Sequence, residues 1–160
     1  MVLDFHRQPT LRGLATFDDF ERWLDLNMRY LRHIKYTGTP TYHALAAQLV
    51  KSDDATRETL AAGYWRWIKL LEQAIQRMKD HDRLVPDADP RGLALAIVSA
   101  HQGGGILAFT YRAEWPHADA ARFAVNYLRL FATDPSERIP RPPKRTRARR
   151  ARSQVDDETD

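Results

Sequence analysis

The chain of 160 residues contains no cysteine. This absence excludes disulfide bonds and thiolate metal sites, and the sequence gives no sign of an oxidising compartment. No run of 18 consecutive apolar residues occurs, and residues 1–13 lack the apolar core of a secretory signal. We therefore expect a cytoplasmic protein that is not secreted and does not interact with a membrane.

Motifs for catalysis and metal binding are also lacking. The six histidines form no His-Glu-x-x-His motif and no pair at helical metal-ligand spacing with a carboxylate, and Gly-x-Ser-x-Gly is absent. The glycine run at residues 103–105 follows no predicted strand and belongs to no phosphate-binding motif. The sequence therefore predicts a protein that is not an enzyme and that has no metal site and no cofactor.

The body of the chain has no net charge. Residues 1–137 contain 17 Lys+Arg and 17 Asp+Glu, whereas residues 138–160 contain 8 and 4, so the tail carries the whole net charge of +4. Six of its basic residues lie between Lys144 and Arg152. Such a stretch is either a solvated tail or a non-specific nucleic-acid contact, because without aromatic or base-reading residues it has no sequence specificity.

What is present is helical periodicity. Three residues are placed as helix N-caps, namely Thr16, Ser52 and Asp89. Two prolines suit first helical turns, Pro40 and Pro90. Apolar residues at steps of three and four predict helices at about residues 16–37, 40–51, 52–82, 90–113 and 117–132. We therefore predict an all-α antiparallel bundle at residues 16–134, after a lead-in at 1–15 and before a disordered tail at 135–160.

The last two predicted helices each have two apolar faces. Residues 93–98 are all apolar, and the last helix has one stripe at Ala121, Val125 and Leu128 and another through Phe123. A helix that covers one face of a monomer needs a single apolar stripe, so we expect a homodimer with a four-helix seam. The predicted interface residues are Leu95, Val98, Gln102, Gly105, Phe109, Ala121, Val125 and Leu128. The glycines at 103–105 are interpreted as points of close helix approach.

Polar residues interrupt the aromatic stripes. Asn27 and His101 lie among apolar neighbours, an arrangement typical of ligand pockets, in which apolar walls carry a few placed polar groups. The alternative is a plain core in which His101 is bonded to a carbonyl, because periodicity alone does not separate the two.

These features, in order, resemble the C-terminal regulatory domain of tetracycline-repressor (TetR) type regulators over about Thr16 to Thr133. The matching segments are Leu45-Ala46 before Ser52-Asp53, Leu60 to Trp67, Met78 to Leu84, the Pro-Asp-Ala-Asp-Pro stretch at 86–90, Gln102-Gly103 and the closing amphipathic helix. The resemblance implies an all-helical homodimer that senses an apolar or aromatic effector and whose last two helices form the dimer seam. It implies candidate ligand-binding residues Trp23, Asn27, Tyr30, Tyr64, Trp67, Ile68, Leu71 and His101.

In such regulators an inducer alters the separation of paired N-terminal helix-turn-helix domains. Residues 1–15 are too few for that three-helix reading head, so we expect this chain to be the sensing and dimerisation half of a repressor. DNA binding would then need a helix-turn-helix upstream or on a partner. The alternative is a dimeric interaction module that pairs with a full-length regulator and does not bind DNA itself.

Overall fold

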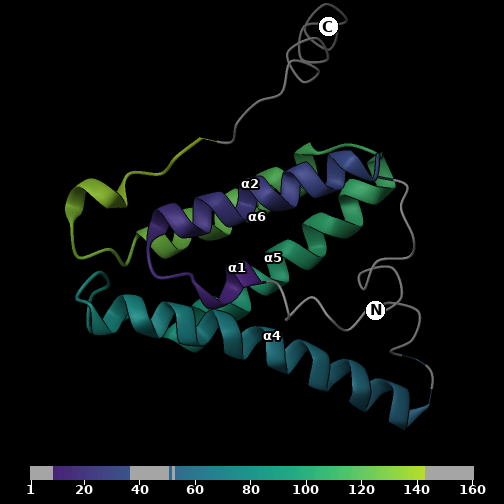
Figure 1. Cartoon of the computed structure of the whole chain (residues 1–160), viewed down its shortest axis with the longest axis horizontal. Coiled ribbons are helices and arrows are strands. Elements are labelled where there is room, and N and C mark those ends of the chain that lie inside the picture. Colours follow the sequence, from purple (N-terminus) through teal and green to yellow (C-terminus); the bar gives the residue numbers. More distant parts are fainter. Residues whose placement is uncertain (1–8, 37–50, 52, 143–160) are drawn as a thin grey trace, which may run out of the picture.

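The computed structural model describes residues 9–36, 51 and 53–142, and the regular elements in these residues are helices (Figure 1). This confirms the prediction of an all-α helical bundle. The elements are α1 (Pro9–Arg12), α2 (Phe17–His33), α4 (Asp54–Asp80), α5 (Pro90–Tyr111), α6 (Trp115–Arg129) and the 3₁₀ turn η2 (Pro135–Arg138). The helix predicted for residues 40–51 lies outside the described residues, apart from Lys51.

Local side-chain chemistry sets where the helices begin. The Thr16 side chain caps α2 by accepting the backbone N–H of Asp19 at 3.1 Å. Asp89 caps α5 and Pro90 is its first residue, as the sequence predicts. The predicted cap of α4 was wrong by one residue, because Asp53 is the N-cap and accepts the N–H of Thr56.

Helix α5 packs between α4 and α6, and α2 lies along α6 (Figure 1). The core between them also extends to residues before α2, because Leu11 and Leu14 are fully buried. Arg77 of α4 holds this segment in place by donating from Nη2 to the carbonyls of Arg12 at 3.1 Å and Leu14 at 2.9 Å. Residues 11–14 are therefore part of the folded unit, and not only a lead-in to it.

One glycine of the run at residues 103–105 lets α5 and α6 approach each other closely. A Cβ on Gly104 would lie 2.9 Å from the Cα of His117, closer than real Cβ atoms come to another atom, and 3.0 Å from the Cβ of Ala120. A Cβ on Gly103 would meet nothing within 4 Å. Close helix approach thus explains Gly104, whereas Gly103 lies on the outer side of α5.

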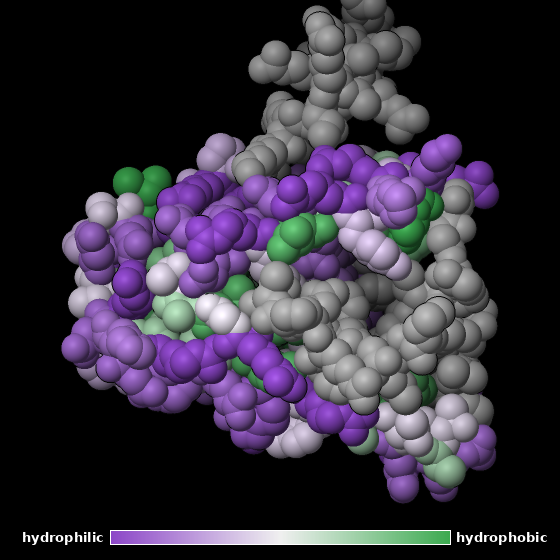
Figure 2. Space-filling model, in the orientation of Figure 1, coloured by the Kyte–Doolittle hydropathy of each residue, from purple (hydrophilic) through white to green (hydrophobic). Residues whose placement is uncertain are grey.

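Helix α5 is also the most apolar helix of the described chain. By length and composition alone it could cross a membrane, because an 18-residue stretch of it has a mean hydropathy of 1.4. Of that stretch, 44% is buried inside the protein. Core helices of soluble proteins meet the same criteria. Figure 2 shows mainly hydrophilic side chains on one face of the molecule, with apolar ones visible between them.

Candidate functional site

Four helices meet at a group of buried aromatic and polar side chains, here called the aromatic–histidine cluster. It consists of Trp23 and Asn27 from α2, Trp67 from α4, His101 from α5 and His117 from α6. Each is at most 7% exposed. The cluster therefore draws residues from segments up to 94 positions apart in sequence, counted from Trp23 to His117.

His101 is at the centre of the cluster. Its ring stacks on Trp23, with centroids 5.5 Å apart and an interplanar angle of 22°. It meets Trp67 edge-on at 5.0 Å and His117 edge-on at 4.4 Å. Contacts of this kind fix the imidazole in one orientation, because aromatic pairs favour offset-stacked and edge-to-face geometry.

Hydrogen-bonding groups lie within this aromatic shell. Asn27 donates from Nδ2 to the carbonyl of Trp23 at 2.8 Å, which directs its Oδ1 to Nε2 of His101 at 3.4 Å. The indole Nε1 of Trp23 is buried and makes no hydrogen bond within the described part of the chain. Burying such a donor without a hydrogen bond costs about 1–3 kcal/mol, so an acceptor oxygen placed beside it would be favoured.

The structure places the predicted ligand-binding residues in three settings. Trp23, Asn27, Trp67 and His101 come together in the cluster, and Leu71 is fully buried in the core, with Tyr64 and Ile68 packed against that core. Tyr30 does not join them, because its side chain is 55% exposed on the outer flank of α2. His117 was missed, although it precedes the Ala121 stripe by one helical step of four residues.

The predicted dimer residues are divided in a similar way. Five of them, Val98, Gly105, Ala121, Val125 and Leu128, are buried within the chain's own fold and so are not available to a second copy. Leu95 is exposed, while Gln102 and Phe109 are half-buried. The exposed large apolar residues of α5 and α6, here called the α5–α6 outer face, are Leu95, Ile106, Leu107, Tyr111, Phe123, Tyr127 and Leu130, together with Trp115 where α6 begins.

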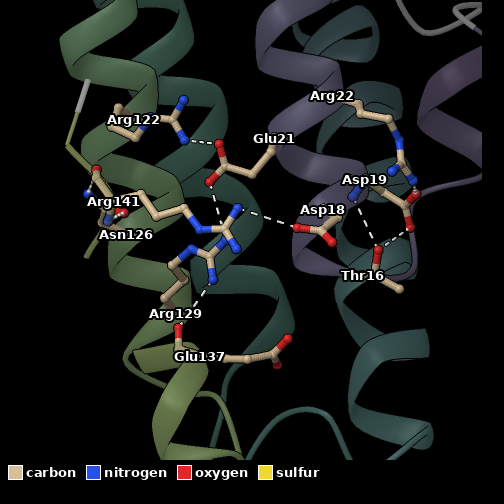
Figure 3. Close-up of polar contacts among 10 residues, drawn as sticks. All are labelled: Thr16, Asp18, Asp19, Glu21, Arg22, Arg122, Asn126, Arg129, Glu137 and Arg141. Carbon is tan, nitrogen blue, oxygen red and sulfur yellow. Dashed lines mark hydrogen bonds and ion pairs between the residues drawn. The ribbon is translucent and has the colours of Figure 1, made fainter. Parts of the chain in front are cut away.

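A buried ion network joins α2 to α6 (Figure 3). Glu21 of α2 pairs through Oε2 with Nη1 of Arg122 and through Oε1 with Nη2 of Arg129, the latter at 3.3 Å. The two arginines are 6% and 1% exposed, and Arg129 also lies over the ring of Phe17 at 4.8 Å. Burial, followed by the neighbouring positive charges, lowers the pKa of both arginines below its ordinary value.

A second polar contact joins the same two helices at their other end. Glu114 accepts from Nη1 of Arg32 at 3.0 Å and from the hydroxyl of Tyr36 at 3.4 Å. Burial, then the charge of Glu114, raises the pKa of Tyr36 to about 12. The relative position of α2 and α6 is therefore fixed by charge pairs on both sides of the aromatic–histidine cluster.

Residues 135–142 continue the fold beyond the predicted boundary at residue 134. The side chain of Asn126 both donates to the carbonyl of Arg141 at 2.9 Å and accepts its N–H at 3.0 Å. Arg141 also reaches Asp18 at 3.4 Å, and Arg129 donates to the carbonyl of Glu137 (Figure 3). The prediction of disorder was thus wrong for 135–142, and the basic stretch 144–152 lies outside the described residues.

Comparison with protein-family models, with curated proteins and with solved structures gives no match to this chain. Within the described residues, no group of three His, Asp or Glu side chains is placed to hold a metal ion. The aromatic–histidine cluster brings flat apolar ring surfaces together with an imidazole, an amide and an indole N–H.

Proposed function

We propose that this chain is the ligand-sensing and dimerisation domain of a TetR-type transcriptional regulator. The observation that carries the proposal is the convergence of α2, α4, α5 and α6 on His101, with Trp23 and Trp67 against its ring. A molecule bound there would contact α5 and α6, which also carry the α5–α6 outer face. Effector binding and subunit pairing would then act on the same two helices.

The chemistry of the cluster favours a flat aromatic effector with one polar group. Indole and imidazole rings give stacking surfaces, and His101 and Asn27 supply hydrogen-bonding atoms deep in an apolar setting. Buried polar atoms of this kind reward a ligand that pairs with them and disfavour one that does not. A phenol or naphthol fits this description.

Binding of 1-naphthol tests this assignment. We expect saturable quenching of tryptophan fluorescence, and His101→Phe should weaken binding roughly 2- to 10-fold, the value of one hydrogen bond. Phe keeps a flat aromatic ring at this position but has no ring nitrogens to form hydrogen bonds. Tyr30→Phe, on the exposed flank of α2, is the matched control and should bind as the wild type does. Unsaturable quenching, or equal losses in both variants, would contradict the assignment.

The α5–α6 outer face supports the dimer. Phe123 is 75% exposed and Leu130 54%, and residues 92–111 contain no Asp, Glu, Lys or Arg. Large apolar side chains that gather on an exposed surface favour an interaction site. The occupant we propose is a second copy, because a patch on two antiparallel neighbouring helices pairs with itself about a two-fold axis as a four-helix seam.

Phe123→Glu should therefore produce monomers. Sedimentation of the wild type should give twice the chain mass of 18.5 kDa, and the variant should dissociate at least 100-fold more readily. The reason is that carboxylates placed in an apolar seam lose hydration and repel each other across the axis. Trp65→Glu, at a 45% exposed position on α4, should remain dimeric. A monomeric wild type would refute the seam, whatever the variants do.

A further inference from the structure

A cleft separate from the aromatic–histidine cluster lies between α1 and α4. It has a volume of about 280 Å³ and is lined by Arg12, Leu70, Gln73 and Arg77. None of the cluster residues lines it. Its size is near the lower end of small-molecule sites, which begin at about 300 Å³, so it suits a small ligand.

Arg77 is held rigidly in this cleft. Its Nη2 donates to two main-chain carbonyls, those of Arg12 and Leu14, and this uses both hydrogens on that nitrogen. A guanidinium has five N–H donors, so three remain on Nε and Nη1. They have no hydrogen-bond or ion-pair partner among the residues that the structure describes, so they are available to a ligand.

Arg12 brings a second positive charge to the same cleft. Its side chain is exposed and makes no ion pair in the described ranges, and no carboxylate is among the lining residues. Two guanidinium groups that share a cleft repel each other, and an oxyanion between them would relieve this repulsion. Arginine donors match the geometry of such oxygens.

We propose that this cleft binds a small organic carboxylate. Arg12 and Arg77 donate to the carboxylate oxygens, the amide of Gln73 adds a polar contact, and the half-buried Leu70 packs against the apolar part of the ligand. This inference goes beyond the proposed function and does not depend on it, because the two sites share no residue.

Titration of the full chain with sodium benzoate, followed by ¹H–¹⁵N correlation spectra, tests the proposal. We expect saturable shifts of the backbone amide signals of Arg12 and of residues 70–77. Benzyl alcohol, with the same ring and no charge, should give none, and inorganic phosphate should bind at least fivefold more weakly than benzoate. Equal binding of benzyl alcohol or phosphate would overturn the carboxylate assignment.

Arg12→Gln should weaken benzoate binding at least fivefold. The side chain is exposed and makes no ion pair in the described ranges, so its replacement leaves the fold intact. Arg29→Gln removes an equal charge from an exposed position on α2 and should leave the affinity unchanged. If the two variants bind benzoate equally well, or if no shift saturates in the wild type, the cleft is not such a site.

Discussion

Glu21→Gln is expected to lose about 3–5 kcal/mol of unfolding free energy. Glu21 is the carboxylate in contact with both Arg122 and Arg129, which are 6% and 1% exposed. Neutralising it leaves two guanidinium charges without their partner in a poorly hydrated site, and breaking one side of a buried pair costs this much. Urea denaturation at 25 °C followed by circular dichroism would measure the loss.

Two further variants separate the effect of burying a charge from the effect of the charge itself. Asp18→Asn removes an ion pair to Arg141 in which both side chains are more than half exposed, and it should cost at most about 1 kcal/mol. Replacing Glu21, Arg122 and Arg129 together by Leu, Met and Met should be close to neutral, because a well-packed apolar set needs no counter-charge. A loss below about 1 kcal/mol in Glu21→Gln would show that the network is not desolvated.

This network could not have been predicted from the sequence. Glu21 and Arg122 are 101 positions apart, and on its own helix each is an ordinary charged residue on a polar flank. Only the packing of α2 against α6 places them together and removes water from them. The helix starts, by contrast, were predictable at Thr16 and Asp89, because a cap depends on residues within one turn of it.

The two stripes of α6 show where periodicity is insufficient. The sequence correctly indicates that the helix has two apolar faces, but not which of them faces the chain's own core. The structure buries the smaller residues, Ala121 and Val125, since they allow α5 and α2 to approach, and leaves Phe123 and Leu130 outside. The second stripe, and not the first, is therefore the one that can contribute to the proposed dimer seam.

The candidate ligand site was also predictable from the sequence only in part. Asn27 and His101 were recognisable as polar residues among apolar ones, and the cluster contains both. Tyr30 does not join them, and the sequence does not reveal this, because aromatic residues on one helix are hard to divide between a buried face and its flank. The contact of His101 with His117 requires the close approach of α5 and α6 at Gly104, which only the folded chain reveals.

Gly104→Ala and Gly103→Ala are therefore expected to change stability in opposite directions. Alanine at 103 meets open space and gains the helix preference of Ala over Gly, about 0.5–1 kcal/mol. Alanine at 104 gains the same preference, but its Cβ would press on the backbone of His117 at 2.9 Å. Overpacking that moves a backbone costs about 1–3 kcal/mol, so the net effect should be destabilising.

The same pair of variants links the packing of α5 on α6 to the candidate site. Because the displaced residue is His117, whose ring contacts His101, Gly104→Ala should also weaken 1-naphthol binding, whereas Gly103→Ala should not. Thermal unfolding and fluorescence titration of both variants would measure the two effects. If both substitutions raised stability and left binding unchanged, α6 would have room to move, and the close contact at Gly104 would not hold His117 in the cluster.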